Sequence, residues 1–574
     1  MLKRALLGLA LAALVVPPLA DAAVTTRPLL PGITYTRELR YVTGGPLVLH
    51  IIRGPKPGGL YALRPVLSNG LVAGVERVSA MQRRLSPNAT LAGINGDLFN
   101  WRTGQPSGMY LEGARLAVSP RTQRSSLAIG TDGLLRIDRI RSGGAWQVDG
   151  LEAHPVAQLN RTFDTTSVGL FTPVWGPRTP ADPLAVEGVL TDVPRIVPNR
   201  EMTVHVYTRR RGGGRPIPAG GAVLQAKGFW GDVLRRELPL GGTIRLHVGL
   251  APWATGLRGA LGGGPLLVRN GEPILHAGEE FTWDQLALRH PRTAVGQLAD
   301  GRIIFVVADG RYAGSVGLRA WELALQMARL GAVRAMALDS GGSSTMAFNG
   351  RVLNRPSDGT ERSIADALML FYYGVYVPPL RRLVMSPNGD GIDDVQTLAA
   401  KIVRPSLVDA RLIRPNGTLA WHLREQRSPG AVLKRVGPLV LMEGRWVWAV
   451  EATDGAGRKS RMVRTFKVNN TLGFLRFSTT RVRVVPLRGG RLVSSFDLIH
   501  KSDLAVDVRN SSGYVIRHLA RRADVPPGRI AVVWNGKRDD GRVVESGVFR
   551  VRVTAVNGLG RVSLERRISV WRDD

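Results

Sequence analysis

Short apolar runs separated by Gly, Pro, Asn and Asp recur along most of this chain of 574 residues, and this pattern predicts a protein rich in β-strands. Helical spacing of apolar positions is rarer. It occurs over Leu71–Arg84, where it predicts an amphipathic helix, and over Leu318–Leu330, where Gly331 stands at the position that ends helices. The chain is therefore expected to combine many strands with few helices.

The second of these helices is flanked by two expected strands. Apolar runs over Arg302–Ala308 and Arg334–Leu338 predict strands that are buried on both faces. A strand, a helix and a strand with short connections indicate a right-handed crossover between parallel strands. Asp309 and Asp339, which follow the two strands, are then expected at the same edge of the sheet, where open α/β sheets bind ligands. The alternative is that both residues only begin loops, as Asp often does next to Gly.

The periodicity changes again at 376–380, beyond which helical patterns disappear. We expect an α+β domain, with a mixed sheet and helices, over 23–379, and a Pro- and Gly-rich insertion within it around 173–242. Two all-β sandwiches of the immunoglobulin-like class are expected to follow, over 380–472 and 473–574, because each segment has the length and turn spacing of one such domain.

The first residues read as a signal peptide over 1–22. Lys3 and Arg4 precede an apolar run over Ala5–Val16, and Ala20-Asp21-Ala22 has the small residues that a signal peptidase needs. A membrane anchor is the alternative, but the run ends at a Pro pair and is shorter than the roughly 20 residues that cross a bilayer. The mature protein is thus expected to be secreted or associated with the cell envelope, and not integral to the membrane.

The formal net charge is +33, with 69 arginines and nine lysines against 45 acidic residues. The arginines are scattered and the chain is expected outside the cytoplasm, so nucleic acid is not an expected partner. Anionic cell-envelope polymers are candidate partners. The alternative is that the positive charge reflects a compositional bias without a function. No cofactor or metal ion is expected, because the sequence has no cysteine, no HExxH spacing and no GxxxxGK[ST] loop.

Acidic and glycine-rich turns carry the candidate chemistry. The turn after the second expected strand runs Asp339-Ser340-Gly341-Gly342-Ser343-Ser344-Thr345, and its backbone N–H groups and hydroxyls can hold an oxyanion. Five further segments have a comparable character: Asn95-Gly96-Asp97-Leu98-Phe99, Gly262-Gly263-Gly264-Pro265, Arg292-Thr293-Ala294-Val295-Gly296, Asp309-Gly310-Arg311 and Glu361-Arg362.

These six segments, in this order, resemble the motif set of the phosphodiester glycosidase family. That family includes the lysosomal enzyme that uncovers mannose 6-phosphate by removing N-acetylglucosamine from a phosphodiester, and bacterial proteins related to exopolysaccharide. The resemblance covers about 91–373, and the sequence departs from it at Ser340, where many relatives have Gly, and at Asp97, where some do. It implies a hydrolase, a glycosidase that cleaves a sugar-1-phosphodiester or a related envelope or exopolysaccharide linkage.

The resemblance also implies roles for single residues. Asp339 would be the carboxylate beside the anomeric carbon, and Asp97 or Asp309 would be its acid/base partner, although a structural turn is the alternative for Asp309. Arg292 and Arg362 would clamp the phosphate, with surface ion pairs as the alternative. The implied substrate-binding residues are Asn95, Gly263, Gly264, Arg292, Arg311, Gly341, Gly342, Ser343, Thr345 and Arg362.

The two expected sandwiches carry separate resemblances. Trp534–Arg542, followed by Glu545–Phe549, resembles the closing hairpin of the immunoglobulin-like domain of the flagellar hook-capping protein family, which implies a spacer or attachment role. Ser386–Gly391 resembles the opening of related repeats on exported bacterial proteins. The residues Asn388, Asp390, Asp393 and Asp394 fit either a calcium loop or an Asx-rich turn, and the missing Glu at the twelfth loop position favours the turn.

Two other functions remain open from the sequence. One is a non-catalytic protein of the same fold that binds cell wall or polysaccharide, and the other is an enzyme for ordinary glycosides without phosphate.

Overall fold

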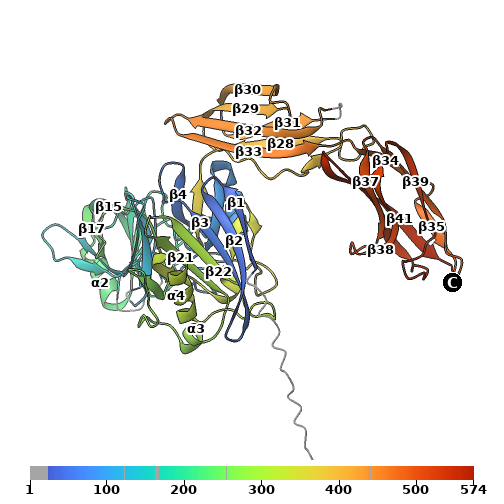
Figure 1. Ribbon diagram of the computed structural model, residues 1–574. Coiled ribbons are helices and arrows are strands. Elements are labelled where there is room, and N and C mark those ends of the chain that lie inside the picture. Colours follow the sequence, from blue (N-terminus) through green and yellow to red (C-terminus); the bar gives the residue numbers. More distant parts are fainter. Residues whose placement is uncertain (1–22, 122, 162–166, 254, 438–440, 574) are drawn as a thin grey trace, which may run out of the picture. The chain divides into compact units, whose positions relative to one another are not determined.

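The computed structural model describes residues 23–121, 123–161, 167–253, 255–437 and 441–573, so the expected signal peptide lies outside it. The described residues form two compact units, one within Met1–Ser86 and Thr90–Tyr372, the other within Pro87–Ala89 and Tyr373–Asp574 (Figure 1). Both consist mainly of strands, as the apolar pattern predicts. None of the helices in the described ranges has the length and hydropathy needed to span a bilayer.

An eight-stranded sheet forms the centre of the first unit, in the order β1-β2-β3-β22-β21-β23-β19-β20. Its neighbouring strands are all antiparallel. The strands are β1 (Ala23–Leu30), β2 (Ile33–Val42), β3 (Gly45–Gly54), β19 (Leu266–Arg269), β20 (Glu272–Pro273), β21 (Arg292–Leu298), β22 (Ile303–Ala308) and β23 (Ala332–Ala337).

The helix α4 (Ala320–Arg329) joins β22 to β23, as predicted. Leu323, Ala324 and Met327 are completely buried in one core with residues of β21, β22 and β23, and each large apolar side chain buried in this way stabilises the fold by about 1.5–3 kcal/mol. Gly331 follows the helix with a φ of 89°, the left-handed conformation that ends helices at little cost only for glycine.

The predicted parallel direction of β22 and β23 is confirmed, but the two strands are not neighbours in the sheet. The segment Arg292–Leu298, which the sequence pattern marked only as a motif, is itself a strand, β21, and it pairs antiparallel with both. The strands β22 and β23 therefore run in the same direction without being neighbours. Asp309 and Asp339 still follow strands that end at one edge of the sheet, and Arg292, paired with Ala308, begins β21 at that edge.

Two five-stranded sheets accompany this central sheet in the first unit, in the orders β25-β24-β5-β26-β4 and β7-β6-β18-β8-β9. The first consists of β4 (Tyr61–Leu67), β5 (Thr90–Asn95), β24 (Met346–Phe348), β25 (Arg351–Val352) and β26 (Asp366–Tyr372). The second consists of β6 (Tyr110–Glu112), β7 (Arg115–Val118), β8 (Ser125–Gly130), β9 (Leu135–Arg139) and β18 (Leu257–Gly262).

The first predicted helix is shorter than expected. It is α1 (Val78–Leu85), which contacts β5 and β24, and it does not include 71–77. Gly74 has a φ of 112°, and the backbone of Glu76 exchanges hydrogen bonds of 2.9 and 3.0 Å with Ile364. The chain before Val78 is therefore held in an extended, non-helical path.

The stretch expected as an insertion contributes to a second eight-stranded sheet, in the order β11-β10-β17-β15-β14-β16-β13-β12. Its strands are β10 (Arg141–Gln147), β11 (His154–Val156), β12 (Gln158–Leu159), β13 (Gly169–Phe171), β14 (Val186–Thr191), β15 (Glu201–Arg211), β16 (Ala222–Ala226) and β17 (Thr243–Ala251). With α2 (Gly228–Glu237) these strands build a core around Trp146 and Leu246, and residues of the sheet β7-β6-β18-β8-β9 share this core. The sheet therefore contains strands from within 173–242 and strands from the segments before and after it.

The second unit is all-β in its described residues. Its first part has the sheets β27-β33-β32-β29-β30 and β28-β31, and its last part has β34-β36-β39 and β35-β41-β40-β37-β38. The bounds are β27 (Val384–Met385), β28 (Gln396–Ile402), β29 (Ser406–Ile413), β30 (Leu419–Arg427), β31 (Gly430–Val436), β32 (Gly444–Asp454), β33 (Lys459–Val468), β34 (Leu472–Phe477), β35 (Arg481–Val484), β36 (Leu492–Leu498), β37 (Ser502–Arg509), β38 (Val515–Val525), β39 (Gly528–Trp534), β40 (Gly547–Asn557) and β41 (Gly560–Arg572).

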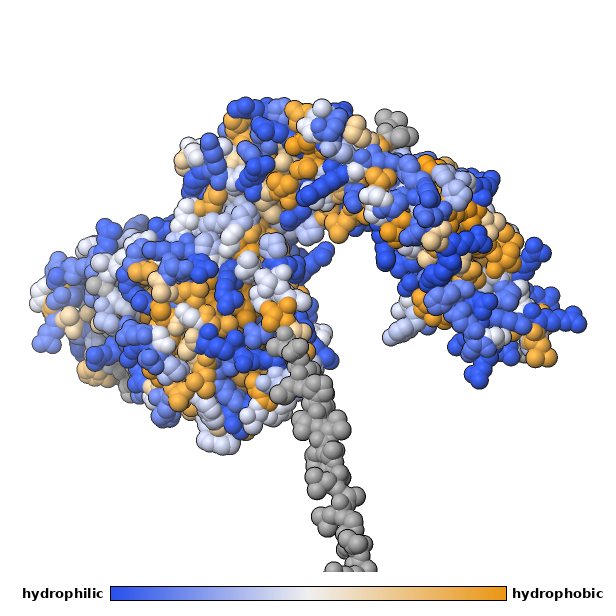
Figure 2. Space-filling model, viewed as in Figure 1, coloured by the Kyte–Doolittle hydropathy of each residue, from blue (hydrophilic) through white to orange (hydrophobic). Residues whose placement is uncertain are grey.

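The acidic loop at 388–394 forms Asx turns. The Asp394 carboxylate accepts the backbone N–H groups of Asn388, Gly389 and Gly391 at 2.7–3.0 Å, and the Asp390 carboxylate accepts that of Ile392 at 2.7 Å. These acceptors order the loop through its own backbone. Hydrophilic residues are spread widely over the face of the molecule seen in Figure 2, in keeping with the scattered arginines of the sequence.

Candidate active site

Asn95, the last residue of β5, ties three of the predicted segments together. Its side chain is completely buried, and its Oδ1 accepts the Thr293 hydroxyl at 2.7 Å and the Thr345 backbone N–H at 3.1 Å. Its Nδ2 donates to the backbone carbonyl of Asp339 at 2.9 Å. Protein groups therefore occupy the Asn95 amide, and this residue positions the edge of the sheet instead of facing open space.

Asp97 lies two residues beyond β5 and is 1% exposed. Its carboxylate accepts the backbone N–H of Leu98 at 2.8 Å and that of Gly108. Gly262 is packed against it so closely that a Cβ there would lie 2.5 Å from Asp97 Oδ2. Burial raises the pKa of Asp97 to about 6, against the lowering effects of these N–H groups and of nearby arginines.

Asp339 begins the glycine-rich turn after β23 and is partly buried. Its backbone N–H donates to Gly96 at 2.9 Å, and its carboxylate accepts the Ser340 N–H at 2.8 Å and the Ser343 hydroxyl. Burial raises the pKa of Asp339 to about 6, and the bond from Ser343 opposes that rise. Two carboxyl groups on adjoining turns therefore titrate within the range that acid/base chemistry uses.

A third carboxyl group, that of Asp366 at the start of β26, was not predicted from the sequence. It is completely buried, its Oδ1 accepts the backbone N–H of Asp97 at 2.7 Å, and its Oδ2 has no hydrogen-bond partner among the described residues. Burial, and then the charge of Asp97, raise the pKa of Asp366 well above its usual value. A lone acidic residue at the head of the apolar run 367–372 is the sequence feature that could have identified it.

Arg362 is the predicted cation that the structure brings to Asp339. Its Nε and Nη2 donate to Asp358 at 2.9 and 2.5 Å, and its Nη1 donates to the Ser343 hydroxyl at 3.4 Å. The guanidinium lies over the ring of Trp101 at 4.6 Å, and that ring is 72% exposed. Gly342 passes so close to this guanidinium that a side chain at 342 would collide with it.

Two further arginines that the motifs did not include, Arg124 and Arg161, act on the same carboxyl groups. Arg161 donates to the backbone carbonyls of Ser107 and Gly108 at 2.8 Å, and burial lowers its pKa to about 10. Arg124 donates to the Glu280 carbonyl at 3.1 Å and lowers the pKa of both Asp97 and Asp339. Both arginines lie outside the glycine-rich motifs, so the motifs did not identify them.

Arg292 points away from this cluster. Neighbouring side chains of a strand point to opposite faces, and Thr293 is the one that meets Asn95. The Arg292 guanidinium is buried and donates to the carbonyls of Leu318 and Leu288 at 2.8 and 3.0 Å. Burial, and then the charge of Arg311, lower its pKa to about 10. The structure therefore does not place Arg292 and Arg362 on the same side, as a shared clamp would require.

Asp309 is engaged in a separate buried network. Its carboxylate contacts His50 Nε2 at 3.1 Å and accepts the Tyr312 hydroxyl at 3.2 Å and the Arg355 N–H at 3.1 Å. His50 Nδ1 in turn lies 2.8 Å from the Tyr35 hydroxyl. This environment matches the structural alternative for Asp309.

The remaining predicted residues line or brace the same edge. Arg311 has a φ of 66° and places its guanidinium over Gly341, with Nη2 at 3.1 Å from His290 Nδ1. Gly263 lies tightly against β23, where a Cβ would be 2.8 Å from the Ala337 carbonyl. Gly264 is packed in the same way against Glu279, and Thr345 is buried beside Asn95. In the described parts of the chain, no three His, Asp or Glu side chains gather so as to hold a metal ion.

A family model matches part of the chain. Residues 200–371 match the family model described as phosphodiester glycosidase. This stretch carries a phosphodiester glycosidase domain. The predicted resemblance is thereby confirmed, and the match includes Asp339, Arg362 and the Gly262–Pro265 segment, while Asn95 and Asp97 precede it.

Two curated proteins are similar to this chain over short segments. An uncharacterized SPbeta prophage-derived protein, YomE, of Bacillus subtilis (strain 168) is 36% identical over 117 residues, which are 20% of this chain and 18% of YomE. The mouse (Mus musculus) N-acetylglucosamine-1-phosphodiester alpha-N-acetylglucosaminidase is 32% identical over 102 residues, 16% of this chain and 20% of that enzyme. The chain thus matches about a fifth of the length of these relatives.

A solved structure of another protein shares the fold over part of this chain. The crystal structure of a hypothetical protein from Synechocystis has a TM-score of 0.54 at 24% identity, and the match covers 62% of this chain and 64% of that one.

Proposed function

We propose that this protein is an exported hydrolase that cleaves a sugar-1-phosphodiester, or a related linkage of an envelope or exopolysaccharide glycan. The observation that carries this proposal is the pair formed by Asp97 and Asp339. Both carboxyl groups lie on turns fastened to each other, both have a pKa raised to about 6, and the Arg362 guanidinium and Ser343 hydroxyl adjoin Asp339. The phosphodiester glycosidase match includes Asp339, Ser343 and Arg362, and it does not include Asp97.

In the proposed reaction, the bond between the anomeric carbon and the phosphate oxygen breaks and water adds to the carbon. Asp339, as the carboxylate, stabilises the oxocarbenium-like transition state or takes a proton from the attacking water. Phosphate is already a good leaving group, so the acid/base partner, assigned to Asp97, gives modest help. Asp309 is not assigned to this step, because its carboxylate belongs to a separate buried network with His50 and Tyr312.

The phosphate is assigned to the side of Asp339 where Arg362 and Ser343 lie. An arginine fork binds phosphate through charge-assisted hydrogen bonds, and backbone N–H groups of the turn at Gly341 and Gly342 add donors. Arg362 is already held by Asp358, which fixes the direction of its fork before substrate arrives. Arg311, lying over Gly341, adds positive charge on the other side of the same turn.

The test is release of sugar from a synthetic sugar-1-phosphodiester. We expect the wild type to hydrolyse it and Asp339→Asn to lose about 10²–10⁴-fold in kcat, the usual contribution of an acid/base group. Asp300→Asn, a change on an exposed turn, is the matched control and should leave kcat unchanged. Hydrolysis of a neutral glycoside at the same rate as the phosphodiester, or retention of activity in Asp339→Asn, would count against the proposal.

The export part of the proposal has its own test. Expression of the full chain in a host with a secretory pathway should yield a mature protein beginning at Ala23 outside the cytoplasm. Retention of an intact N-terminus in the cytoplasm would contradict it.

A further inference from the structure

A pocket with several arginines lies in the first unit, where the two five-stranded sheets meet. Strands β4 and β26 of one sheet, strands β6 and β7 of the other and the last turn of α1 supply its walls. Its volume of about 350 Å³ lies within the range of small-molecule sites, which is about 300–1,000 Å³. Its described lining includes none of the residues assigned to the carboxyl groups or to the phosphate, so it is separate from the candidate active site.

The base of this pocket is part of the hydrophobic core. Tyr110, Ala117 and Phe371 are buried there, and the first two belong to one core cluster. The guanidinium of Arg64 lies 5.0 Å over the Phe371 ring. Because a closely packed base offers few polar groups, recognition of a ligand depends on the side chains around the opening.

Four arginines line the pocket, and we call them the arginine rim: Arg64, Arg84, Arg115 and Arg195. Two of them are held by carboxylates. Arg64 Nη2 donates to Glu112 at 2.5 Å, and Arg84 donates to Glu76 at 2.8–3.2 Å. These bonds fix the directions of two guanidinium groups before a ligand arrives, which lowers the entropy lost on binding.

The other two members of the rim, Arg115 on β7 and Arg195, have no ion-pair partner among the described residues. The segment of Arg195 is fastened to β7, since the Leu116 N–H donates to the Ile196 carbonyl at 2.9 Å. Both guanidinium groups therefore belong to the same wall. Glu112 is the one carboxylate in the described lining, so the pocket carries positive charge that the protein does not neutralise.

The size of the pocket and its charge indicate the kind of ligand. A guanidinium fork binds a carboxylate or a phosphate through paired, charge-assisted hydrogen bonds. Single-stranded nucleic acid is bound in grooves that follow successive phosphates and that offer aromatic rings to the bases. Here the cations surround one small space and the rings of Tyr110 and Phe371 are buried, so a single sugar ring with an acidic group fits better.

We propose that this pocket binds an acidic sugar residue of an anionic polysaccharide, through the carboxylate or phosphate of that residue. The net charge of +33 made anionic polymers candidate partners, and the pocket gives this interaction a place on the first unit. The inference does not depend on the proposed hydrolysis, because the arginine rim contains no residue assigned to that reaction.

The test compares acidic and neutral sugars. Trigalacturonate and glucose 6-phosphate are titrated calorimetrically into the mature protein, with maltotriose and glucose as neutral references of equal size. We expect at least one acidic probe to bind about tenfold or more tightly than its reference, and added NaCl to reduce this preference because salt screens exposed charges. The tighter acidic probe identifies the acidic group. Equal binding of acidic and neutral sugars overturns the proposal.

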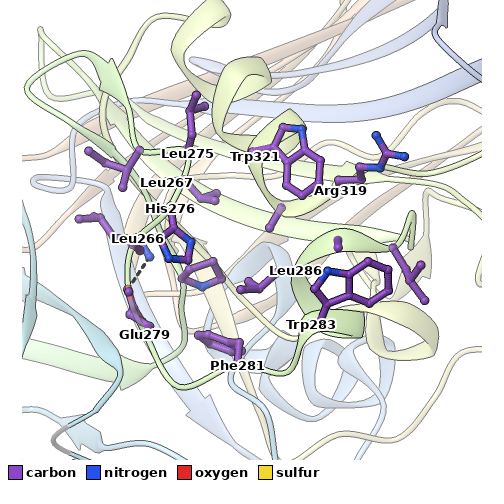
Figure 3. Close-up of a pocket in the computed structure, with 17 residues that line it drawn as sticks. Leu266, Leu267, Leu275, His276, Glu279, Phe281, Trp283, Leu286, Arg319 and Trp321 are labelled. Atoms are coloured by element: carbon purple, nitrogen blue, oxygen red, sulfur yellow. Dashed lines mark hydrogen bonds between the residues drawn. The ribbon is translucent and has the colours of Figure 1, made fainter.

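Substitutions in the rim locate the site. Arg115→Gln and Arg195→Gln should each weaken binding of the tighter acidic probe about tenfold, the usual contribution of a charge-assisted hydrogen bond. Arg319→Gln is the matched control. Arg319 also has no ion-pair partner among the described residues, but it lines the cavity beside α3 (Trp283–Ala287), where it lies 5.3 Å over the Trp321 ring (Figure 3). Equal weakening by all three substitutions would indicate a general effect of charge and overturns the proposal.

A hydrolysis assay separates this inference from the proposed function. Arg115→Gln and Arg195→Gln should cleave the synthetic sugar-1-phosphodiester with the wild-type kcat, and the binding result stands even if the wild type hydrolyses no phosphodiester. Loss of acidic-sugar binding in Arg362→Gln, with wild-type binding in both rim variants, would place the anion at the turn of Asp339 and overturns the proposal. Tighter binding of a single-stranded DNA oligonucleotide that depends on the same two arginines also overturns it.

Discussion

The side-chain amide of Asn95 donates to the backbone carbonyl of Asp339 across 2.9 Å, although 244 positions separate the two residues. The Asp339 backbone N–H returns a bond of 2.9 Å to the carbonyl of Gly96. The turn after β5 and the turn after β23 are therefore held as one piece. The two carboxyl groups that these turns carry, those of Asp97 and Asp339, keep their separation without support from a ligand.

Replacing Asn95 should loosen this junction. Asn95→Ala leaves the Thr345 N–H and the Asp339 carbonyl without their buried partner, and we expect the free energy of unfolding to fall by about 2 kcal/mol or more. Denaturant unfolding measures the change. Asn416→Ala removes comparable turn bonds at an exposed position and should cost less than about 0.5 kcal/mol. Equal losses in the two variants would contradict the assigned role.

The pH profile of the activity should have an acid limb and an alkaline limb, both near pH 6. Asp339 acts as a carboxylate, so the rate rises as the pH increases through its pKa of about 6, and Asp97 acts in its protonated form, so the rate falls above its own pKa of about 6. A profile of kcat/KM from pH 4 to 9 measures both limbs. Asp97→Asn should remove the alkaline limb while the acid limb stays. A rate that is constant from pH 5 to 8 would refute both assignments.

Asp366 should make the stability of the protein depend on pH. Because burial raises its folded pKa, the folded protein keeps this proton while the unfolded chain releases it near pH 4. Wild-type stability is therefore lost as the pH rises above about 4, and Asp366→Asn escapes this loss. The Tm advantage of the variant should grow between pH 4.5 and pH 8.

A carboxyl group with the opposite shift provides the control for that experiment. The N–H of Leu134, followed by the side chain of Arg136, lowers the pKa of Asp132. Asp132 therefore stabilises the protein at neutral pH, and this contribution is lost as the pH falls through its lowered pKa. Asp132→Asn should become relatively less stable as the pH rises. The same trend in both variants would show that the burial of Asp366 is not the cause.

Gly262 should tolerate no side chain. A Cβ at this position would lie 2.5 Å from Asp97 Oδ2, a distance that forces the carboxylate or the strand to move. We expect Gly262→Ala to lower kcat by about tenfold or more and to lower the Tm. Gly143→Ala is the matched control, because a Cβ added to that strand glycine would have no atom within 4 Å. Full activity in Gly262→Ala would mean that the position of Asp97 is unimportant for turnover.

Local sequence patterns determined several elements of this protein. The apolar run before Asp309, the helical spacing before Gly331 and the apolar run before Asp339 correctly predicted β22, α4 and β23. Each depends on residues close together in the chain, where side-chain periodicity decides which face is buried. The direction of β22 and β23 followed from the length of the connection, and with it the common edge of Asp309 and Asp339.

Only the tertiary structure decided the neighbours of those strands and the environment of each charged group. Local spacing does not reveal that β21 inserts between β22 and β23, because strand order depends on hydrogen bonds between distant segments. It also does not reveal that Arg292 donates to the Leu318 carbonyl, that Asp309 contacts His50, or that Asp366 lies buried beside Asp97. The pKa of a carboxyl group depends on its desolvation and its nearest charges, and both exist only once the chain has folded.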